Sequence, residues 1–394
     1  LSNLSDDRMR VAKSGAWWDT NPERALANNS VVYTEKPDVG TFMKEWLALY
    51  ESKSGERGIF NRVSAQQQAA KNGRRNAEMD FGTNPCSEII LRPNQFCNLT
   101  EVVCRSGDIM ETLLKKVEVA TILGTIQSTL TKFGYLRKRW QDNTEEERLL
   151  GVSLTGIMDS SVLNLWNGKL PDKLRLLREK AVAVNKEWSR KLGIPQSTAI
   201  TCVKPSGTVS QLVDSASGIH ARHAPYYIRT VRGDNKDPLT EFMKDKGIPS
   251  EPDVMNPDHT TVFSFPMRAD KSAVFRTSMS AIEQLEIWKV YAEHWCEHKP
   301  SVTVSVKEQE WMNVGNWCWD NFNHLSGVSF LPFSDHTYKQ APYQDITEEE
   351  YKKLAKKMPK NIDWKKLQDY ETEDTTKGSQ ELACTAGFCE LVDI

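Results

Sequence analysis

The chain lacks any long apolar run, and no stretch approaches the ~18 residues of a membrane-spanning helix or has the pattern of a signal peptide. It also lacks an excess of charge of one sign, since 51 Lys and Arg oppose 53 Asp and Glu. Eight cysteines in 394 residues are too sparse for the disulfide framework of a small secreted domain. We therefore expect no membrane partner, no direct nucleic-acid binding and a reducing, cytoplasmic location.

What is present is the composition of an ordinary globular protein, with 39% hydrophobic and 26% charged residues. The chain begins LSNLSDDRMR without Met, which indicates a piece of a longer polypeptide. We find no internal repeat.

Helical and strand-like segments alternate along the chain. Residues 172–192 carry an apolar stripe at Leu174, Leu177, Ala181, Val184 and Trp188, the spacing of an amphipathic helix. Further helices are predicted at about 41–53, 108–131, 280–296, 308–324 and 347–358, and strands at 198–203, 261–266, 302–306 and 327–332. This alternation predicts an α/β architecture with mainly parallel strands.

The stretch NPCSEIILRPNQFC places Asn84, Cys86 and Glu88 at alternate positions. In extended backbone these side chains would share one face, and Asn84 precedes a proline that favours extended geometry. Residues IILRPNQF suggest a strand, a turn and a second strand, which would bring Cys97 back toward Cys86. One interpretation is a structural cysteine between two polar residues. The other is a thiol beside a carboxylate that acts as general base on a substrate hydroxyl.

From about residue 371 the sequence loses its periodicity and is rich in small and polar residues, which predicts a mobile tail. Its Cys384 and Cys389 are either incidental thiols, half of a metal site, or a redox dithiol. No second ligand cluster for zinc is evident, so we predict no metal site. From Glu371, the chain to Cys384 can extend about 43–47 Å, enough for a shuttle that exchanges disulfides by contact.

Residues 201–212, TCVKPSGTVSQL, read as a strand, a turn and a helix. Backbone N–H groups and hydroxyls in such a turn can hold a phosphate, although the spacing is not that of a Walker loop and a plain turn is an alternative. In SGIHARHAPYYIRTVR (217–232), His220 and His223 suggest either metal ligands or, as we favour, a polar loop.

The remaining cysteines lie in apolar settings and are expected to be core thiols. These are Cys104, Cys202, Cys296 and Cys318. Trp288 and Trp311 are also expected in the core.

Taken together, the motifs resemble those of ribonucleotide reductases, most closely the adenosylcobalamin-dependent class (class II). They are NPCSEI with FCNLTEVV, TxxKPSGTxS, YYIRTVR, SFLPFSDHTYKQAPYQ and ACTAGFCE, in that order. The resemblance runs from Asn21 to Ile394. An iron-dependent reductase is the nearest alternative, but Tyr226 and Tyr227 follow Thr208 too closely to match its tyrosine pair. A catalytically silent structural or binding fragment is the alternative outside the enzyme class.

The resemblance implies a role for each matching residue. Cys86 would become a thiyl radical that abstracts the 3′-hydrogen of a ribonucleotide, Glu88 would take the 3′-hydroxyl proton, and Asn84 would hydrogen-bond the substrate. Cys97 would be one of two reducing thiols. The substrate phosphates would be bound by Pro205, Ser206, Gly207 and Thr208. Cys384 and Cys389 would re-reduce the active-site disulfide and be reset by thioredoxin or a similar dithiol reductant.

The resemblance also implies the C-terminal part of a ten-stranded α/β barrel with an active-site finger loop over residues 1–370, followed by the tail at 371–394. The second reducing cysteine and the allosteric specificity site would then lie in an N-terminal half outside this chain. The implied cofactor is adenosylcobalamin, which would keep its own base as lower ligand because no D-x-H-x-x-G motif occurs. The tail spacing favours a ribonucleoside triphosphate over a diphosphate as substrate.

Overall fold

The computed structural model describes residues 1–164, 168–333, 339–372, 379–381 and 391–393. The chain forms two compact units. Unit 1 comprises 1–221, 272–274 and 278–333, and unit 2 comprises 222–271, 275–277 and 334–394. The sequence predicts one domain over residues 1–370, and the boundaries between the two units lie within that range.

Unit 1 is built on two sheets. The first has the order β1-β2-β3-β13-β12 and is parallel except between β13 and β3. The second is parallel, with the order β6-β7-β8. A parallel bridge between Val203 and Pro300 joins the end of β8 to the start of β12. The strands are β1 (Ser2–Asn3), β2 (Ser30–Tyr33), β3 (Gly58–Asn61), β6 (Asn98–Val103), β7 (Leu150–Thr155), β8 (Thr201–Cys202), β12 (Val302–Val306) and β13 (Val328–Pro332).

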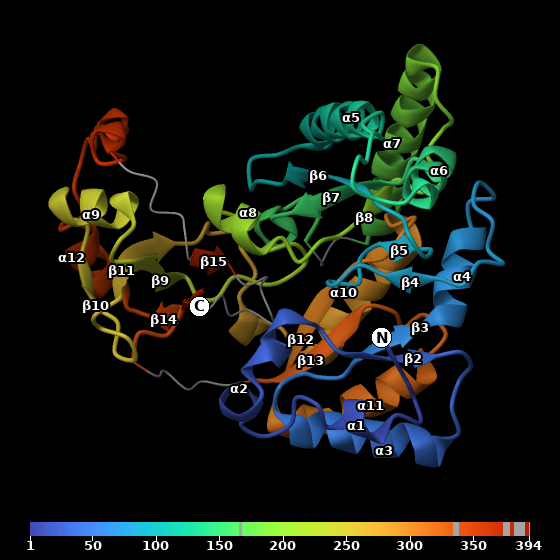
Figure 1. Cartoon of the computed structure of the whole chain (residues 1–394), viewed down its shortest axis with the longest axis horizontal. Helices are drawn as coiled ribbons and strands as arrows, with labels where there is room; N and C mark the ends of the chain where they lie inside the picture. The colour runs from blue at the N-terminus through green and yellow to red at the C-terminus, as the bar shows by residue number, and fades with distance from the viewer. Residues whose placement is uncertain (165–167, 334–338, 373–378, 382–390, 394) are drawn as a thin grey trace. The chain divides into compact units, whose positions relative to one another are not determined.

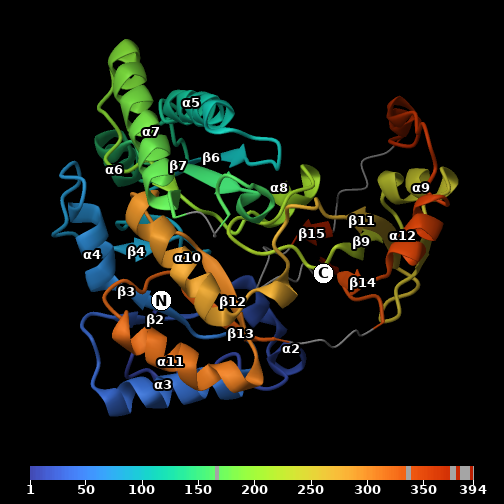
Figure 2. The ribbon, with the colours of Figure 1, turned by 180° about the vertical axis from the view of Figure 1, so that it is seen from behind.

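Helices cover both sheets of unit 1, and Figures 1 and 2 show α5 beside α7, and α3 beside α11. They are α1 (Asp7–Arg10), α2 (Trp17–Thr20), α3 (Val39–Ser52), α4 (Arg62–Ala70), α5 (Met110–Gln127), α6 (Lys138–Glu147), α7 (Leu170–Leu192), α8 (Gly207–Leu212), α10 (Ala281–His294) and α11 (Trp311–Asp320). The predicted α/β class and parallel strands are confirmed for this unit. Closure into a ten-stranded barrel stays a prediction.

Helix α7 shows how the sequence specifies an element. Its predicted stripe is buried at Leu174, Leu177, Ala181 and Val184, and the helix ends at Gly193 in the left-handed conformation (φ 66°) that glycine adopts without strain. Helix α10 begins with a capping box, in which Ser280 and Glu283 each bond the other's backbone N–H.

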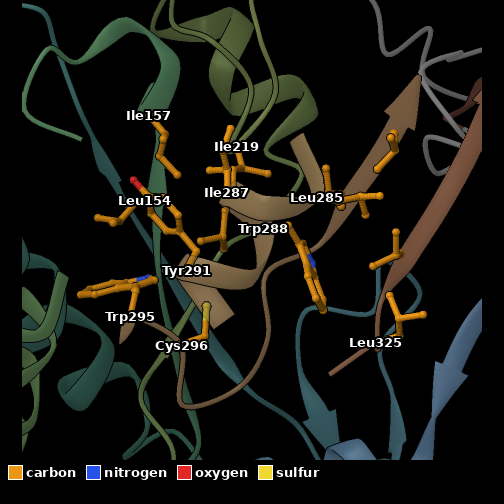
Figure 3. Packing of buried hydrophobic residues seen from close by; sticks show 14 of the residues in the cluster. Leu154, Ile157, Ile219, Leu285, Ile287, Trp288, Tyr291, Trp295, Cys296 and Leu325 are labelled. Atoms are coloured by element: carbon orange, nitrogen blue, oxygen red, sulfur yellow. The ribbon is translucent and has the colours of Figure 1, made fainter. Parts of the chain in front are cut away.

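The centre of unit 1 is an aromatic core supplied largely by α10 and the turn after it. Figure 3 shows Trp288, Tyr291, Trp295 and Cys296 packed among aliphatic residues that include Leu154. The two indole N–H groups donate to backbone carbonyls, from Trp288 to Pro300 at 2.7 Å and from Trp295 to Cys202 at 2.7 Å. The core is thus hydrogen-bonded to the backbone at Cys202 in β8 and at Pro300 just before β12. The four predicted core cysteines and Trp311 are also buried.

Unit 2 contains an antiparallel sheet of order β10-β11-β9-β14. Its elements are β9 (Tyr226–Asp234), α9 (Pro238–Asp245), β10 (Ser250–Pro252), β11 (Thr260–Arg268), β14 (Tyr343–Asp345), α12 (Glu348–Ala355), β15 (Ser379–Glu381) and β16 (Leu391–Asp393). The prediction of mainly parallel strands is therefore wrong here, as is the polar loop over 217–232, because 226–234 form the central strand. That strand alternates buried and exposed residues only weakly.

Five short 3-10 turns complete the described secondary structure: Pro22–Leu26, Ile157–Asp159, Arg276–Ser278, Glu308–Glu310 and Trp364–Asp369. A search of the described ranges finds no helix long and apolar enough to cross a membrane.

Replacing Trp288, which is fully buried, by Ala should lower the free energy of unfolding by about 3–5 kcal/mol, because the core loses a large ring and Pro300 loses its donor. Urea unfolding followed by far-UV circular dichroism measures this loss. The matched variant Met312→Ala on α11 removes a side chain from a residue that is 76% exposed and should change stability little. Equal losses for the two variants would contradict this account of the core.

Candidate active site

The predicted site residues lie in a finger formed by β4 (Gly82–Thr83) and β5 (Ile90–Leu91), which pair antiparallel. Figures 1 and 2 show this finger between the two sheets of unit 1. Residues 84–88 are not extended as predicted. The carbonyl of Asn84 accepts a hydrogen bond from the N–H of Ser87 at 3.0 Å, and Ser87 has φ 64°, so the segment is a turn.

The Asn84 side chain stabilises this turn, which explains why the alternating pattern is misleading. Its Oδ1 accepts a hydrogen bond from the backbone N–H of Ile89 at 3.0 Å. Asparagine readily forms such side-chain bonds to nearby backbone in turns. Within the described part of the chain its Nδ2 donates no hydrogen bond, so one end of the amide stabilises the loop and the other is available to a ligand.

The backbone of the finger is anchored on several sides. The carbonyl of Pro85 accepts from Asn28 at 2.7 Å, that of Cys86 accepts from the hydroxyl of Ser301, and that of Glu88 accepts from the N–H of Lys299 at 3.0 Å. Gly327 passes so close that a Cβ there would lie 2.7 Å from the Ser87 carbonyl oxygen. These contacts fix the backbone of the turn and leave its side chains to face the site.

The base of the finger, at Ile90, is hydrogen-bonded to the side chains of Arg75 and His298. Arg75 donates to the carbonyl of Ile90 at 2.9 Å and pairs with Glu147 at 2.9 Å. His298 is fully buried, with Nδ1 3.3 Å from the N–H of Ile90 and Nε2 3.0 Å from the carbonyl of Leu150. Burial lowers the pKa of His298 well below its usual value, so it is neutral, with Nε2 as donor and Nδ1 as acceptor.

Glu88 is the electrostatic centre of the site. Its side chain is fully buried, and Oε1 accepts a hydrogen bond from Nζ of Lys204 at 2.8 Å. Oε2 is also buried and accepts no hydrogen bond among the described residues. A buried carboxylate oxygen without a donor is uncommon, and it is available to take a hydroxyl proton.

The Cys97 residue is partly exposed, but its thiol is desolvated. Burial, followed by the charge of Glu88, raises the pKa of this thiol well above its usual range. Cys97 is therefore a protonated thiol at neutral pH, and it lies near enough to Glu88 to feel its charge. The predicted approach of Cys97 to Cys86 stays a prediction, and β5 pairs with β4 rather than with the strand that follows Cys97. Cys86 is half-buried.

Three charged residues at the site were missed from the sequence. Lys204 directly precedes the predicted phosphate-binding turn, and Lys299 lies three residues before β12. Glu101 on β6 lies beside that turn, and burial raises its pKa, while hydrogen bonding to Ser206 and the charge of Lys204 lower it. Lys204 and Glu101 had a signal in the sequence, since they lie within the motifs TxxKPSGTxS and FCNLTEVV, whereas Lys299 had none.

The predicted phosphate-binding residues are Pro205 and Ser206 of the loop before α8, with Ser206 at φ 57°, and Gly207 and Thr208 at the start of that helix. The Ser206 hydroxyl is buried and lacks a well-aligned hydrogen bond among the described residues. The backbone N–H of Lys204 donates to the Ser153 hydroxyl at 2.9 Å, which ties the start of this loop to β7. Lys204 thereby connects the loop to the finger.

The remaining predicted residues are two histidines and two tail cysteines. Within the described ranges, no three His, Cys, Asp or Glu side chains gather as metal ligands. His220 is half-buried, with Nδ1 2.9 Å from the Ser217 carbonyl and Nε2 3.0 Å from the N–H of Thr303. His223, in unit 2, lies 2.5 Å from Asp345. Cys384 and Cys389 lie outside the described residues.

Comparison with known proteins identifies relatives of the chain, although no family model matches it. It is 29% identical over 360 residues to the adenosylcobalamin-dependent ribonucleoside-triphosphate reductase of Lacticaseibacillus paracasei, covering 84% of this chain and 47% of that protein. It is 27% identical over 362 residues to the enzyme of the same name from Euglena gracilis, covering 88% and 47%. The chain thus spans about half the length of these curated relatives.

Solved structures agree on the fold. The crystal structure of a B12-dependent (class II) ribonucleotide reductase superposes with a TM-score of 0.75 at 22% identity, covering 93% of this chain and 54% of that one. The class Id ribonucleotide reductase alpha subunit of Actinobacillus ureae gives a TM-score of 0.55 at 14% identity, covering 84% and 70%. The resemblance to the adenosylcobalamin-dependent class is confirmed.

Lys299 provides a test of the site's electrostatics. Burial lowers its pKa to about 7, against the charge of Glu88, which raises it. An unfolded lysine titrates near 10.4, so between about pH 7 and 10 the unfolded chain binds more protons than the folded chain. Deprotonation of Lys299 should therefore raise the free energy of unfolding with increasing pH across this window, by up to about 1.4 kcal/mol per pH unit.

Urea unfolding of the wild type and of Lys299→Met at several pH values measures this contribution, which the variant should lose. Lys191→Met, at a lysine whose side chain is 56% exposed, is the matched control and should keep the wild-type dependence. An identical pH dependence in wild type and Lys299→Met would show that this amine is not desolvated in solution.

Proposed function

We propose that this relative of the adenosylcobalamin-dependent ribonucleotide reductases carries the radical and general-base part of a ribonucleoside-triphosphate reductase, which makes deoxyribonucleotides for DNA synthesis. The observation that carries the proposal is the finger that places Asn84, Cys86 and the buried Glu88 together, with Lys204 linking Glu88 to the loop 205–208. The names of the curated relatives favour triphosphates over diphosphates. The reaction draws on reduced thiols, which fits the cytoplasm.

In the proposed mechanism, Cys86 as a thiyl radical takes the hydrogen atom from C3′ of the ribose and later returns it. Glu88 accepts the 3′-hydroxyl proton through Oε2, the oxygen that lacks a donor in the described structure. Asn84 donates its Nδ2 to a substrate hydroxyl while Oδ1 remains bonded to the finger. Positioning and proton transfer are thus divided between two side chains on an anchored turn.

The reduction step needs two thiols. The C2′–O bond breaks and water leaves, a C2′–H bond forms, and the two thiols become one disulfide. Cys97 supplies one of these thiols, and its raised pKa keeps the proton that must be delivered. We place the second thiol in an N-terminal complement to this chain, which covers only 47% of the Lacticaseibacillus relative. Cys384 and Cys389 would then reduce the disulfide and pass it to thioredoxin or a similar dithiol protein.

The substrate phosphates are assigned to Pro205, Ser206, Gly207 and Thr208. The buried Ser206 hydroxyl supports this assignment because it lacks a well-aligned partner in the described structure. Glu101 beside the loop is half-buried, and burial raises the pKa of its carboxyl, which lessens the charge opposing an anionic ligand.

The proposed cofactor, adenosylcobalamin, supplies when bound the radical that oxidises the Cys86 thiol. The half-buried Cys86 on the turn fits that role. The ring nitrogens of His220 and His298 are all within hydrogen-bonding distance of backbone groups, so neither residue would be free to bind the cofactor.

An activity assay tests the proposal. The chain is mixed with a polypeptide that supplies the portion of its relatives it does not match, together with adenosylcobalamin, a ribonucleoside triphosphate and a dithiol. Deoxynucleotide should form with wild type and fall to background with Cys86→Ser, because a hydroxyl does not replace the thiol in hydrogen-atom transfer.

Cys318→Ser is the matched control, since that thiol is buried in the core and has no assigned role. It should retain activity. The absence of product from a wild-type complex that assembles and binds nucleotide would favour a catalytically silent fragment, and product without cobalamin would favour an iron-dependent enzyme.

A further inference from the structure

Among the described residues, Lys204 is the one side chain that donates a hydrogen bond to the Glu88 carboxylate, at 2.8 Å to Oε1. Burial lowers the pKa of this amine, but the charge and hydrogen bond of Glu88 outweigh that effect and raise it. Lys204 is therefore a cation at neutral pH. The ion pair supplies a positive charge beside the buried Glu88 carboxylate, which would be costly to bury alone.

The second nearby amine does not replace it. Lys299 is 4% exposed, donates to the Ser326 hydroxyl and lies 4.3 Å from the centre of the Phe60 ring. Its pKa of about 7 leaves it only partly charged at neutral pH. Its backbone, rather than its side chain, anchors Glu88.

Titratable groups from several elements interact electrostatically with this pair. They include Cys86 on the finger, Cys97 before β6, Glu101 on β6, Cys202 on β8 and Lys299 before β12. The cysteines whose pKa is raised, Cys97 and Cys202, are neutral at pH 7. Lys204 is thus the main source of positive charge at Glu88.

Lys204 also has a geometric role. By binding Oε1 it leaves Oε2 as the one oxygen open to a ligand. Its backbone N–H is bonded to Ser153, and the next residue is Pro205 of the loop assigned to the phosphates. One residue therefore sets both the orientation of the carboxylate and the start of that loop.

Resting on the proposed function, we infer that Lys204 is a positioning residue that pairs with Glu88 and orients its free oxygen to accept the 3′-hydroxyl proton. General-base catalysis typically accelerates a reaction by about 10²–10⁴-fold. Removal of the cation that supports the base should therefore lose part of this rate acceleration. The substrate itself is bound mainly by other groups, so binding should suffer less than turnover.

The test uses the chain with its complement, cobalamin, substrate and dithiol, and compares wild type, Lys204→Met and Lys204→Arg. Lys204→Met should lower kcat about 10- to 100-fold with KM within about threefold. It should also move the acid side of the pH–kcat profile to higher pH, because it removes the cation that lies 2.8 Å from the Glu88 carboxylate. Lys204→Arg keeps the charge and should restore the profile and most of kcat.

Lys116→Met is the matched control, because it removes a lysine paired with Asp108 at 2.6 Å that has no place in the site. It should leave kcat and the pH profile unchanged. A double-mutant cycle of Lys204→Met with Glu88→Gln, followed by urea unfolding, should show a coupling of at least about fivefold in the unfolding equilibrium constant.

An active wild type with Lys204→Met within twofold in kcat and an unshifted profile would overturn the role of Lys204 alone. Additivity in the unfolding cycle would overturn it as well. A wild type that makes no deoxynucleotide would overturn the proposed function, and this inference with it.

Discussion

The burial of one carboxylate, Glu88, is the constraint on which the site depends. A fully buried charge must be paired and hydrogen-bonded, or it is neutralised. Lys204 provides that pairing at 2.8 Å and comes from β8 and its following loop, whereas Glu88 comes from the finger. The ion pair therefore joins two segments far apart in sequence, and the aromatic core around α10 holds the strand ends from which they extend.

The finger shows how backbone and side-chain functions are separated. Its carbonyls at 85, 86 and 88 are all bonded to residues outside the finger, and its base is bonded to Arg75 and His298. These backbone hydrogen bonds, together with the one that Asn84 Oδ1 accepts from the N–H of Ile89, keep Ser87 in a left-handed conformation. Such anchoring restricts the motion of the reacting groups, which is what a radical site needs in order to limit side reactions.

Elements with a repeating apolar pattern were predicted correctly from the sequence, whereas features that depend on a single side-chain contact were not. The stripe of α7 and the apolar runs of β12 and β13 gave correct elements because burial on one face leaves a periodic signal. The turn at Asn84 was read as extended, since alternation cannot reveal that the Asn84 side chain bonds the N–H of Ile89. Strand β9 was missed because its pattern is broken by charged residues, and the pairing of Lys204 with Glu88 is a contact across 116 positions that no local pattern encodes. The roles of Asn84, Cys86, Glu88 and Cys97 came from family resemblance, and the geometry supports them without testing the chemistry.

The central claim is that Cys86 exchanges hydrogen with C3′ while Glu88 takes the hydroxyl proton. The most direct measurement is the release of tritium to water from a 3′-tritiated ribonucleoside triphosphate during turnover by the chain, its complement and adenosylcobalamin. Because the hydrogen taken from C3′ is held on the Cys86 thiol, where part of it can exchange with water before it is returned, the account predicts slow release with wild type and none above background with Cys86→Ser, with Glu88→Gln slower than wild type. Release that is unaffected by Cys86→Ser would contradict it, because the hydrogen would then leave C3′ by a route that does not involve this thiol.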